Sequence, residues 1–302
     1  MRTAARAMRR LAAALALGAG FALAACAAKA APPDKAQGYR FEIVTGDDDS
    51  AVTARITDDL YKRLVPTFAA FRTELAQRRR MVTIAVGPDA LRKAAARRCD
   101  CVVIAAFTSS QVWRSVLEKL PPARAAAMTA VYAEPAPADQ LQLASLLYRR
   151  PVRVAAIIGR HTAFYAPSLQ GKADLVRAGL DDDVNDLLAR VKRSEVLLAL
   201  PDSAVYTPEN VRSILLSTYR RKQAVIGFSA DMVKVGALAS TYSEVEDINA
   251  QVAEVAAAFV ATGELPAPQF PHYFRTAINE GVARSLDIAV SEEARRFARP
   301  RP

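Results

Sequence analysis

The sequence is poor in the residues on which most metal and phosphate sites depend. Its 302 residues include two histidines, three cysteines and one tryptophan, and glycine occurs only 12 times. Structural zinc sites usually take four Cys or His ligands, so His161, His272 and the few cysteines argue against a metal site. Neither GxGxxG nor GxxxxGK occurs, which argues against a phosphate-cradling loop. We therefore expect no metal and no cofactor.

The sequence also lacks the marks of a hydrolase. The segment from Gly227 to Asp231, GFSAD, half resembles the nucleophile elbow G-x-S-x-G, but an aspartate replaces its second glycine. No oxyanion-forming segment accompanies Ser229, and only the two histidines could serve as its base. We expect no enzymatic activity.

Long hydrophobic runs are absent, because the apolar stretch from Leu11 is shorter than the roughly 20 residues that a bilayer helix needs. Its arginine-rich start and small-residue end are typical of a secretory signal over residues 1–25. The last residues, Leu23-Ala24-Ala25-Cys26, resemble the lipobox of bacterial lipoproteins, in which the cysteine is acylated and becomes the new N-terminus. We expect an exported chain anchored by a lipid on Cys26, with residues 26–39 as an Ala/Pro-rich tether. The alternative is an ordinary signal peptide with a chance cysteine.

Positive charge is in excess, but much of it belongs to the predicted signal. The formal charge of +10 falls to +6 without the four arginines of residues 1–25. The remaining basic runs, 78–80 and 220–222, are flanked by helical patterns and are not interleaved with aromatics. They are typical of solvated helix ends, so we expect no nucleic-acid partner.

Cys99 and Cys101 are separated by one residue. If a strand began at Asp100, their Cα atoms would lie near the upper limit of about 6.8 Å for a disulfide. We therefore expect free thiols, with a strained bridge as the alternative.

From about residue 40, continuous Val, Ile and Ala runs alternate with helical patterns, as in parallel sheets that are buried on both faces. The runs predict strands at 41–46, 82–87, 101–107, 129–134, 152–159, 195–202 and 224–230, and helices at 52–77, 88–98, 110–120, 138–150, 173–180 and 208–222. Pro88 and Thr207-Pro208 are typical helix starts. The fold class is α/β, and about two domains fit this length. We expect two doubly wound parallel-sheet lobes joined by a hinge, at 40–150 and 151–265, with 266–302 returning to the first lobe and ending in a helix.

Ligands of open parallel sheets bind at the carboxyl ends of the strands. Thr108, Ser109 and Ser110 follow one strand, where amides and hydroxyls suit a carboxylate or another anion, although plain N-capping explains them equally. Asp202 and Tyr206 follow another strand. A carboxylate there would hold an ammonium group and the tyrosine would cover an apolar part, unless Asp202 only bonds its own turn.

The second half of the chain carries an ordered set of short motifs. An apolar strand ends in Leu-Pro-Asp, another in Val-Ile-Gly-x-Ser, and a Val-x-x-Gly-Ala-Leu and a Tyr-Ser pair follow. The residues are Leu200 to Asp202, Val225 to Ser229, Val233 with Gly236 to Leu238, Tyr242 with Ser243, and Asn279 with Ala283, Leu286 and Ile288. Over about residues 150–290 this order resembles the substrate-binding proteins of ABC importers.

The resemblance implies the type I periplasmic binding-protein fold, in which two lobes close on a small organic, amino-acid-like solute. Some members are similar to tryptophan or tyrosine binders. It also implies that Ser229 and Gly236 let the backbone approach the cleft and that Tyr242 caps the ligand, unless this stretch is only a tight interlobe packing loop. The expected partners are the solute, an ABC permease or another membrane protein, and the membrane through the lipid anchor, at the periplasmic face in a Gram-negative host.

Two departures from the family pattern affect this interpretation. The segment after Ala130 passes to the next helix without the usual glycine-containing connection, so the first lobe looks compressed. Ala224 stands where a proline is usual. The first departure motivates an alternative function, a solute-free scaffold that acts as a periplasmic sensor or assembly partner of a membrane protein.

Overall fold

The computed structural model of the chain describes residues 39–47, 50–69, 80–179 and 181–301. The predicted signal, Cys26 and nearly all of the tether lie outside these residues. The first sheet consists of β1 (Tyr39–Val44), β2 (Arg80–Val86), β3 (Cys101–Thr108) and β4 (Met128–Tyr132). The second consists of β5 (Val154–Ile158), β6 (Asp174–Arg177), β7 (Val196–Leu198), β8 (Ala224–Ile226), β9 (Ala239–Tyr242) and β10 (Arg275–Ile278).

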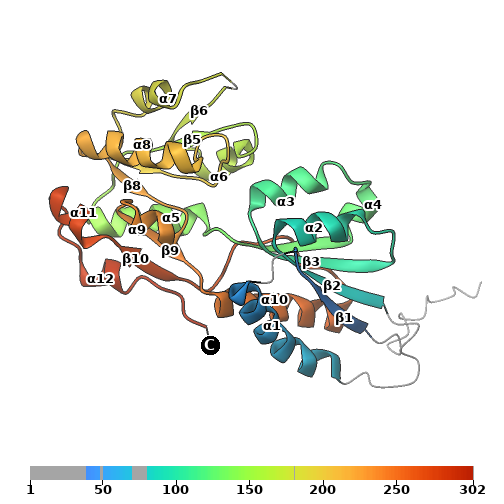
Figure 1. The fold of residues 1–302 in the computed structure, drawn as a ribbon. Helices are drawn as coiled ribbons and strands as arrows, with labels where there is room; N and C mark the ends of the chain where they lie inside the picture. The colour runs from blue at the N-terminus through green and yellow to red at the C-terminus, as the bar shows by residue number, and fades with distance from the viewer. Residues whose placement is uncertain (1–38, 48–49, 70–79, 180, 302) are drawn as a thin grey trace, which may run out of the picture. The chain divides into compact units, whose positions relative to one another are not determined.

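The helices, seen in Figure 1, are α1 (Ala51–Ala69), α2 (Gly87–Ala96), α3 (Ser110–Leu117), α4 (Pro122–Ala125), α5 (Pro137–Tyr148), α6 (Ala166–Leu169), α7 (Val184–Arg190), α8 (Pro208–Arg220), α9 (Ala230–Lys234), α10 (Val245–Thr262), α11 (Glu280–Ser285) and α12 (Glu292–Arg295), with a 3₁₀ turn, η2 (Ala163–Tyr165). None of the described helices is both long and apolar enough to cross a membrane.

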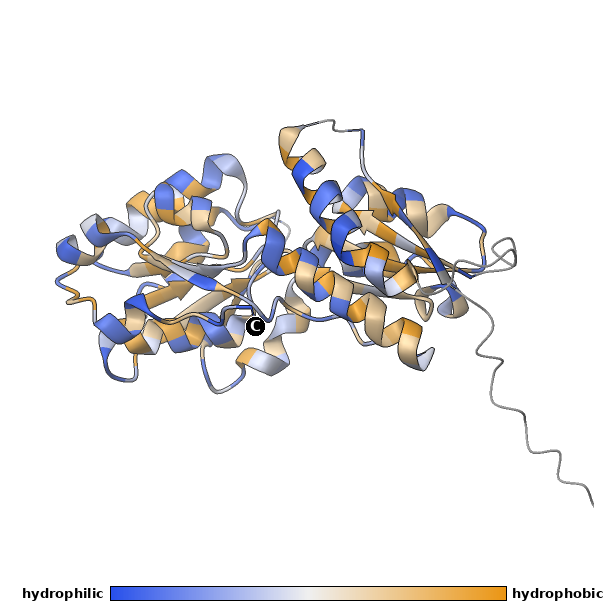
Figure 2. Cartoon of the chain, turned by 90° about the horizontal axis from the view of Figure 1, so that it is seen from below, coloured by the Kyte–Doolittle hydropathy of each residue, from blue (hydrophilic) through white to orange (hydrophobic). Residues whose placement is uncertain are grey.

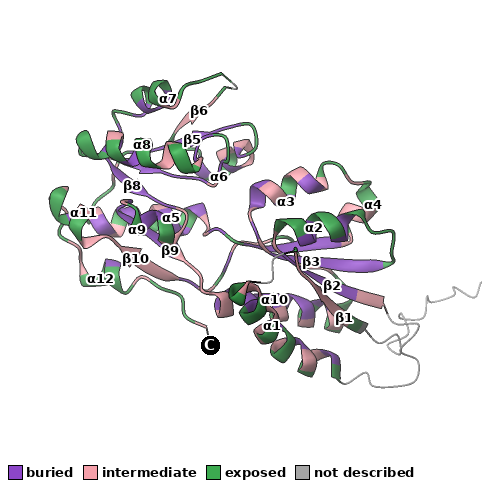
Figure 3. Cartoon of the chain, in the orientation of Figure 1, coloured by how far each residue is buried: buried purple, intermediate pink, exposed green. Residues whose placement is uncertain are grey.

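The first sheet is parallel throughout, and its strands lie in chain order β1-β2-β3-β4. Its apolar runs are buried on both faces, as the sequence predicts, and β3 is purple in Figure 3. Ile84 and Ile104 pack against α1 and α10 on one face. Ala85 and Ala105 pack against α2 and α3 on the other. Each strand thus needs apolar side chains at successive positions.

The connections in this sheet have an unusual geometry. The chain steps from β1 to β2 and from β2 to β3 in the same direction, yet α1 and α2 cover opposite faces. Two steps in one direction on opposite faces have opposite hands, whereas about 98% of such crossovers are right-handed. One of the two crossovers is therefore of the rare hand, and the first of them includes residues 70–79, which lie outside the described part.

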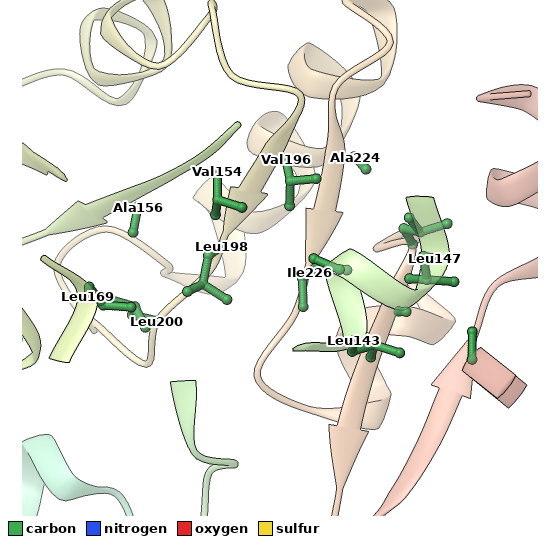
Figure 4. Packing of buried hydrophobic residues seen from close by; sticks show 14 of the residues in the cluster. Leu143, Leu147, Val154, Ala156, Leu169, Val196, Leu198, Leu200, Ala224 and Ile226 are labelled. Carbon is green, nitrogen blue, oxygen red and sulfur yellow. The ribbon is translucent and has the colours of Figure 1, made fainter. Parts of the chain in front are cut away.

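The second sheet has the order β10-β9-β8-β7-β5-β6 and is parallel except for β10. Because β5 lies between β6 and β7, the chain direction across the sheet reverses there, as in doubly wound folds. Helices α5, α6, α11 and α12 cover one face and α7, α8 and α9 the other. Figure 4 shows Leu143 and Leu147 of α5 beside Ile226 of β8. Apolar residues, orange in Figure 2, gather along the strands.

Two helices each follow a strand of one sheet but pack against the other sheet. Helix α5 follows β4 of the first sheet but packs on the second, where the buried Gln140 side chain bonds the Gly227 carbonyl (2.9 Å) and the Thr241 amide (3.0 Å). Helix α10 follows β9 of the second sheet but packs on the first. Gln269 then bonds Ala130 and Tyr132 of β4 before the chain returns to β10. Three crossing segments therefore join the lobes, and the predicted ranges 40–150 and 151–265 each contain one helix that packs on the other sheet.

Arginines near the C-terminus form ion pairs with the two helices that follow a crossing, α5 and α10. Arg301 bonds Asp247 of α10 (2.8 Å), which Arg275 of β10 also bonds (2.9 Å). Arg299 bonds Asp139 of α5 at 3.2 Å. Asp247 is 3% exposed, so these pairs are shielded better than surface pairs, which contribute little.

The α/β class and its parallel sheets are confirmed, as are the helix starts at Pro88 and Thr207-Pro208. The helix predicted at 173–180 is wrong, since residues 174–177 form edge strand β6 beside β5. That run is short and half exposed, so its period does not separate helix from strand, and its pairing partner is distant in sequence. Basic residues 220–222 end α8 and are exposed, as expected.

Candidate functional site

Loops from both lobes line one cavity of about 470 Å³ at the carboxyl ends of the strands. Its wall contains Ser109, Asp202 and Tyr206, all predicted site residues, together with Arg92, Gln111, Val112, Ser115, His161, Pro201, Ser203 and Phe228. This volume is within the range of small-molecule sites, about 300 to 1,000 Å³.

Asp202 lies in the loop that follows β7, and its carboxylate is almost fully buried. Oδ2 accepts hydrogen bonds from the Gly159 amide (3.1 Å) and the Thr162 hydroxyl (2.6 Å), and Oδ1 from the Ala204 amide (3.0 Å). All three donors belong to the second lobe. Asp202 lines the cavity as expected, but its oxygens already hold the loops after β5 and β7 together.

Tyr206 presents a different situation. The side chain is 7% exposed, and its ring meets that of Phe228 edge to face with centroids 5.9 Å apart. Its buried hydroxyl has no hydrogen-bond partner among the described residues. Burial, with the charge of Asp202, raises the pKa of Tyr206, so the hydroxyl stays protonated at neutral pH. A buried hydroxyl without a partner costs free energy unless something else bonds it.

The segment from Thr108 to Ser110 does not present free amides, contrary to our expectation. The Ser110 amide donates to Glu134 (2.9 Å), and the Ser109 hydroxyl caps α3 by accepting from the Val112 amide. The Thr108 hydroxyl donates to the Ala106 carbonyl at 3.3 Å. Of the three residues, only Ser109 lines the cavity. Capping therefore accounts for Ser109, as the N-cap preference of serine predicts, while Thr108 and Ser110 bond other partners.

Ser110 belongs instead to a buried cluster behind the cavity. Its hydroxyl bonds Glu134 and the Tyr165 hydroxyl (2.6 Å), and Tyr165 also donates to Glu134 (2.9 Å). Glu134 is 3% exposed, and its burial raises its pKa. Burial and the charge of Glu134 likewise raise the pKa of Tyr165. This cluster joins α3, the segment after β4 and η2 of the second lobe.

The three residues suggested by the family resemblance lie elsewhere. Ser229 caps α9 by accepting from the Met232 amide (3.2 Å), and it lines a separate groove of about 610 Å³ with Gly236. Gly236 has a φ of +126°, which favours glycine. Tyr242 ends β9 opposite Arg275 and lines none of the described cavities. The structure does not bring them to the cavity of Asp202 and Tyr206.

Our sequence reasoning missed the loop after β5, whose residues Arg160, His161 and Phe164 meet α3. A second cavity of about 280 Å³ is lined by these residues and by Gln111, Arg114, Ser115 and Glu118, and it shares Gln111, Ser115 and His161 with the larger one. The carboxyl-end rule applied to strand 152–159 would have found this loop, but its polar residues look like ordinary surface.

Direct bonds also cross this region between the lobes. The Gln111 amide donates to the Ser203 hydroxyl (2.9 Å), and the Ser203 backbone amide donates back to Gln111 (3.2 Å). The Arg114 guanidinium lies 3.9 Å from the centre of the Phe164 ring, a cation–π contact that fixes its position. The site is thus lined by hydroxyls, an amide and cations.

Comparisons with known proteins give the fold a context. No family model matches the chain, and no curated protein matches its sequence. Solved structures do match: a ligand-free, open substrate-binding protein with adhesive properties from Clostridium difficile (TM-score 0.55, 11% identity, covering 86% of this chain and 98% of that one) and an ABC domain from Streptococcus pneumoniae in complex with L-Trp (TM-score 0.50, 14%, 85% and 97%). A conserved domain protein from Vibrio cholerae gives similar values (0.50, 15%, 85% and 97%).

The chain shares the two-lobed α/β fold of these structures. The fold implied by the resemblance in sequence is therefore confirmed. In this fold the two cavities stand where loops of both lobes meet, lined by α3 from the first lobe and by the segments after β5 and β7 from the second.

The cysteine prediction is wrong within this fold. Cys99 and Cys101 form a disulfide with their Cα atoms 5.2 Å apart. Strand β3 begins at Cys101, and residues 99–100 form a bend, so the two Cα atoms approach more closely than in an extended strand. Among the described residues, no group of three or more Cys, His, Asp or Glu side chains could hold a metal ion.

Proposed function

We propose that this protein is an extracytoplasmic solute-binding protein of an ABC-type importer, which carries a small organic solute between its lobes and performs no bond chemistry. The observation that carries the proposal is the cavity of about 470 Å³ whose wall comes from both lobes and includes Tyr206, whose buried hydroxyl has no partner among the described residues. The fold it shares with a substrate-binding protein and with an L-Trp complex supports it.

Within this proposal Ser109, Asp202 and Tyr206 face the solute. Tyr206 offers a hydrogen bond, while Asp202 shapes the loop that carries Ser203 and Tyr206. Thr108 and Ser110 act from behind the wall, and Ser229, Gly236 and Tyr242 contribute to packing near the crossings.

Thermal denaturation of the purified protein with a panel of amino acids, nucleosides and carboxylates tests the proposal. A solute at 100 times its dissociation constant stabilises the folded state by about 2.7 kcal/mol, which raises the melting temperature measurably. Tyr206→Phe should weaken that stabilisation without lowering the stability of the free protein, because it removes only the unpartnered hydroxyl. A panel without any stabilising member at millimolar concentrations would contradict solute binding.

We also propose that the chain is anchored by a lipid on Cys26. Labelled palmitate should enter the wild-type protein in a bacterial host, whereas Cys26→Ser should remain unlabelled and leave the membrane fraction. Label on the serine variant, or a soluble wild type, would show that the segment is an ordinary signal peptide.

The second candidate function is a solute-free scaffold that contacts a membrane protein. The direct bonds between Gln111 and Ser203 and between Ser110 and Tyr165 favour it, since they join the lobes without a ligand. The polar wall of the cavity favours the solute receptor. Gln111→Ala separates the two, because it should loosen a scaffold but change solute affinity in a receptor.

A further inference from the structure

The cavities beside α3 differ in their balance of charge, and this difference concerns the class of solute. The inference rests on the proposed function. The smaller cavity is lined by Arg114, Arg160 and His161, with Glu118 as its carboxylate. Within the described residues neither Arg114 nor Arg160 makes an ion pair with an acidic side chain, although 17 such pairs occur elsewhere.

Two guanidiniums and one carboxylate lie in this wall, so it carries a local excess of positive charge. Arg92, which lines the larger cavity, is already paired with Asp89 at 2.6 Å. Arg114 is held over Phe164 and cannot swing freely into solvent. Clefts lined by one sign of charge raise the local concentration of the opposite ion. Arginine also matches carboxylate and phosphate groups through its fork of donors.

The larger cavity offers no free anionic partner to a positively charged group of the solute. Its one carboxylate, Asp202, already accepts three hydrogen bonds from Gly159, Thr162 and Ala204. The rest of its wall contains no carboxylate: it consists of apolar and aromatic side chains, serines, Gln111 and the basic residues Arg92 and His161. An ammonium group there would lose its hydration without gaining a free anionic partner, which is costly.

We infer that the solute is a small organic anion without an ammonium group, whose carboxylate or phosphate lies between Arg114 and Arg160 and whose uncharged body occupies the cavity beside Tyr206. His161 lines both cavities and therefore stands where the charged and uncharged parts of the solute join.

Two series of probes that keep an apolar body and vary its charged groups test the inference. The aromatic series is 3-phenylpropionate, L-phenylalanine, 2-phenylethylamine and phenyl phosphate, and the aliphatic series is butyrate, 2-aminobutyrate and butylamine. Titration calorimetry on the purified full chain should show the anion of at least one series binding about tenfold more tightly than its zwitterion. The ratio of phenyl phosphate to 3-phenylpropionate then distinguishes a phosphate from a carboxylate solute.

Three variants locate the anion. R114Q and R160Q should each weaken binding of the anionic probe about tenfold, as expected for loss of a charged hydrogen bond. R193Q is the control, since Arg193 is exposed, makes no ion pair with a described acidic side chain and lines neither cavity, and it should change affinity less than about twofold.

The outcomes separate the inference from the proposed function. Zwitterions that bind as tightly as the anions overturn the inference and leave the solute receptor standing. Anion binding that R114Q and R160Q leave unchanged also overturns it. Failure of every probe in both series overturns the inference, and the wider panel of the thermal denaturation test then decides whether the solute receptor stands.

Discussion

The two sheets of the protein follow different strand orders, and this decides where polar side chains converge. In the second sheet the order reverses at β5, so the loops after β5 and β7 leave the sheet side by side, and Gly159, Thr162 and Asp202 bond one another there. In the first sheet the described strands run in chain order without a reversal. Its contribution to the site comes from α3 with its N-cap Ser109 and from Arg92 of α2. The comparison teaches that the second lobe fixes the shape of the site, while both lobes supply its cations, Arg114 from the first and Arg160 from the second.

The largest expected effect concerns whether the lobes are independent. Leu198→Ala in the second core should cost about 2 to 5 kcal/mol, because Leu198 is 1% exposed and leaves a cavity. Since α5 and α10 each pack on the opposite sheet, the first lobe should lose stability too. Trp113, the only tryptophan, lies in the first core and reports on that lobe alone. In the variant, the urea midpoints measured by tryptophan fluorescence and by circular dichroism should both fall. A tryptophan midpoint that stays at the wild-type value would show that the first lobe unfolds independently.

A pair of glycines sharpens the contrast between the sheets. Gly159 follows the first strand of the second lobe, and a Cβ there would lie 2.5 Å from Oδ2 of Asp202. Gly46 follows the first strand of the first lobe, where a Cβ would be 3.6 Å from its nearest neighbour, an ordinary contact. Gly159→Ala should therefore cost about 1 to 3 kcal/mol through overpacking. Gly46→Ala is the control and should be close to neutral in the same urea titration. Equal costs would show that the polar cluster is not tightly built.

The buried carboxyl behind α3 predicts a dependence on pH. Burial raises the pKa of Glu134 above its ordinary 4.5, so the folded protein keeps the proton after the unfolded chain has lost it. This stabilisation is complete below pH 4.5 and is lost as the pH rises through the folded pKa. Glu134→Gln cannot ionise, so its stability relative to wild type should increase with pH in that window by about 1.4 kcal/mol per unit. Unfolding midpoints measured from pH 4 upward check this, and parallel curves would argue against a raised pKa.

The smallest expected effect compares two helix caps. Ser109 caps α3 in the first lobe and Ser229 caps α9 in the second, and alanine at either should cost about 1 kcal/mol. Only Ser109 lines the cavity of Asp202 and Tyr206, so only Ser109→Ala should also reduce affinity for a solute. An equal loss of affinity in Ser229→Ala would restore that residue to the site predicted from the family resemblance.

The sequence alone predicted the features that depend on neighbouring residues in the chain, namely helix starts and buried strands. Pro88 and Thr207 begin helices because their backbone and side chain suit that position whatever surrounds them. The buried runs of β2 and β3 could be recognised for the same reason. It failed at β6, which forms only because β5 lies beside it.

The site was harder to predict than the fold, because its residues meet through pairings far apart in the sequence. Asp202 was placed at the correct strand end, but its bond to Gly159 spans 43 positions and changes its role from ligand anchor to loop support. Arg114 and Arg160 carry no signal in the sequence, since only the three-dimensional structure brings them into the wall of one cavity.

The position of α10 has a consequence for the order of synthesis. Ile84 and Ile104 of the first sheet rest on Val252, Ala256 and their neighbours, which are made more than a hundred residues later. Domains usually fold as units while the chain is being made, the N-terminal one first. Here the first lobe cannot complete its core until residue 262 has been added. The N-terminal half therefore stays incompletely folded through most of translation, and an incompletely folded chain is the form that can be threaded through a membrane.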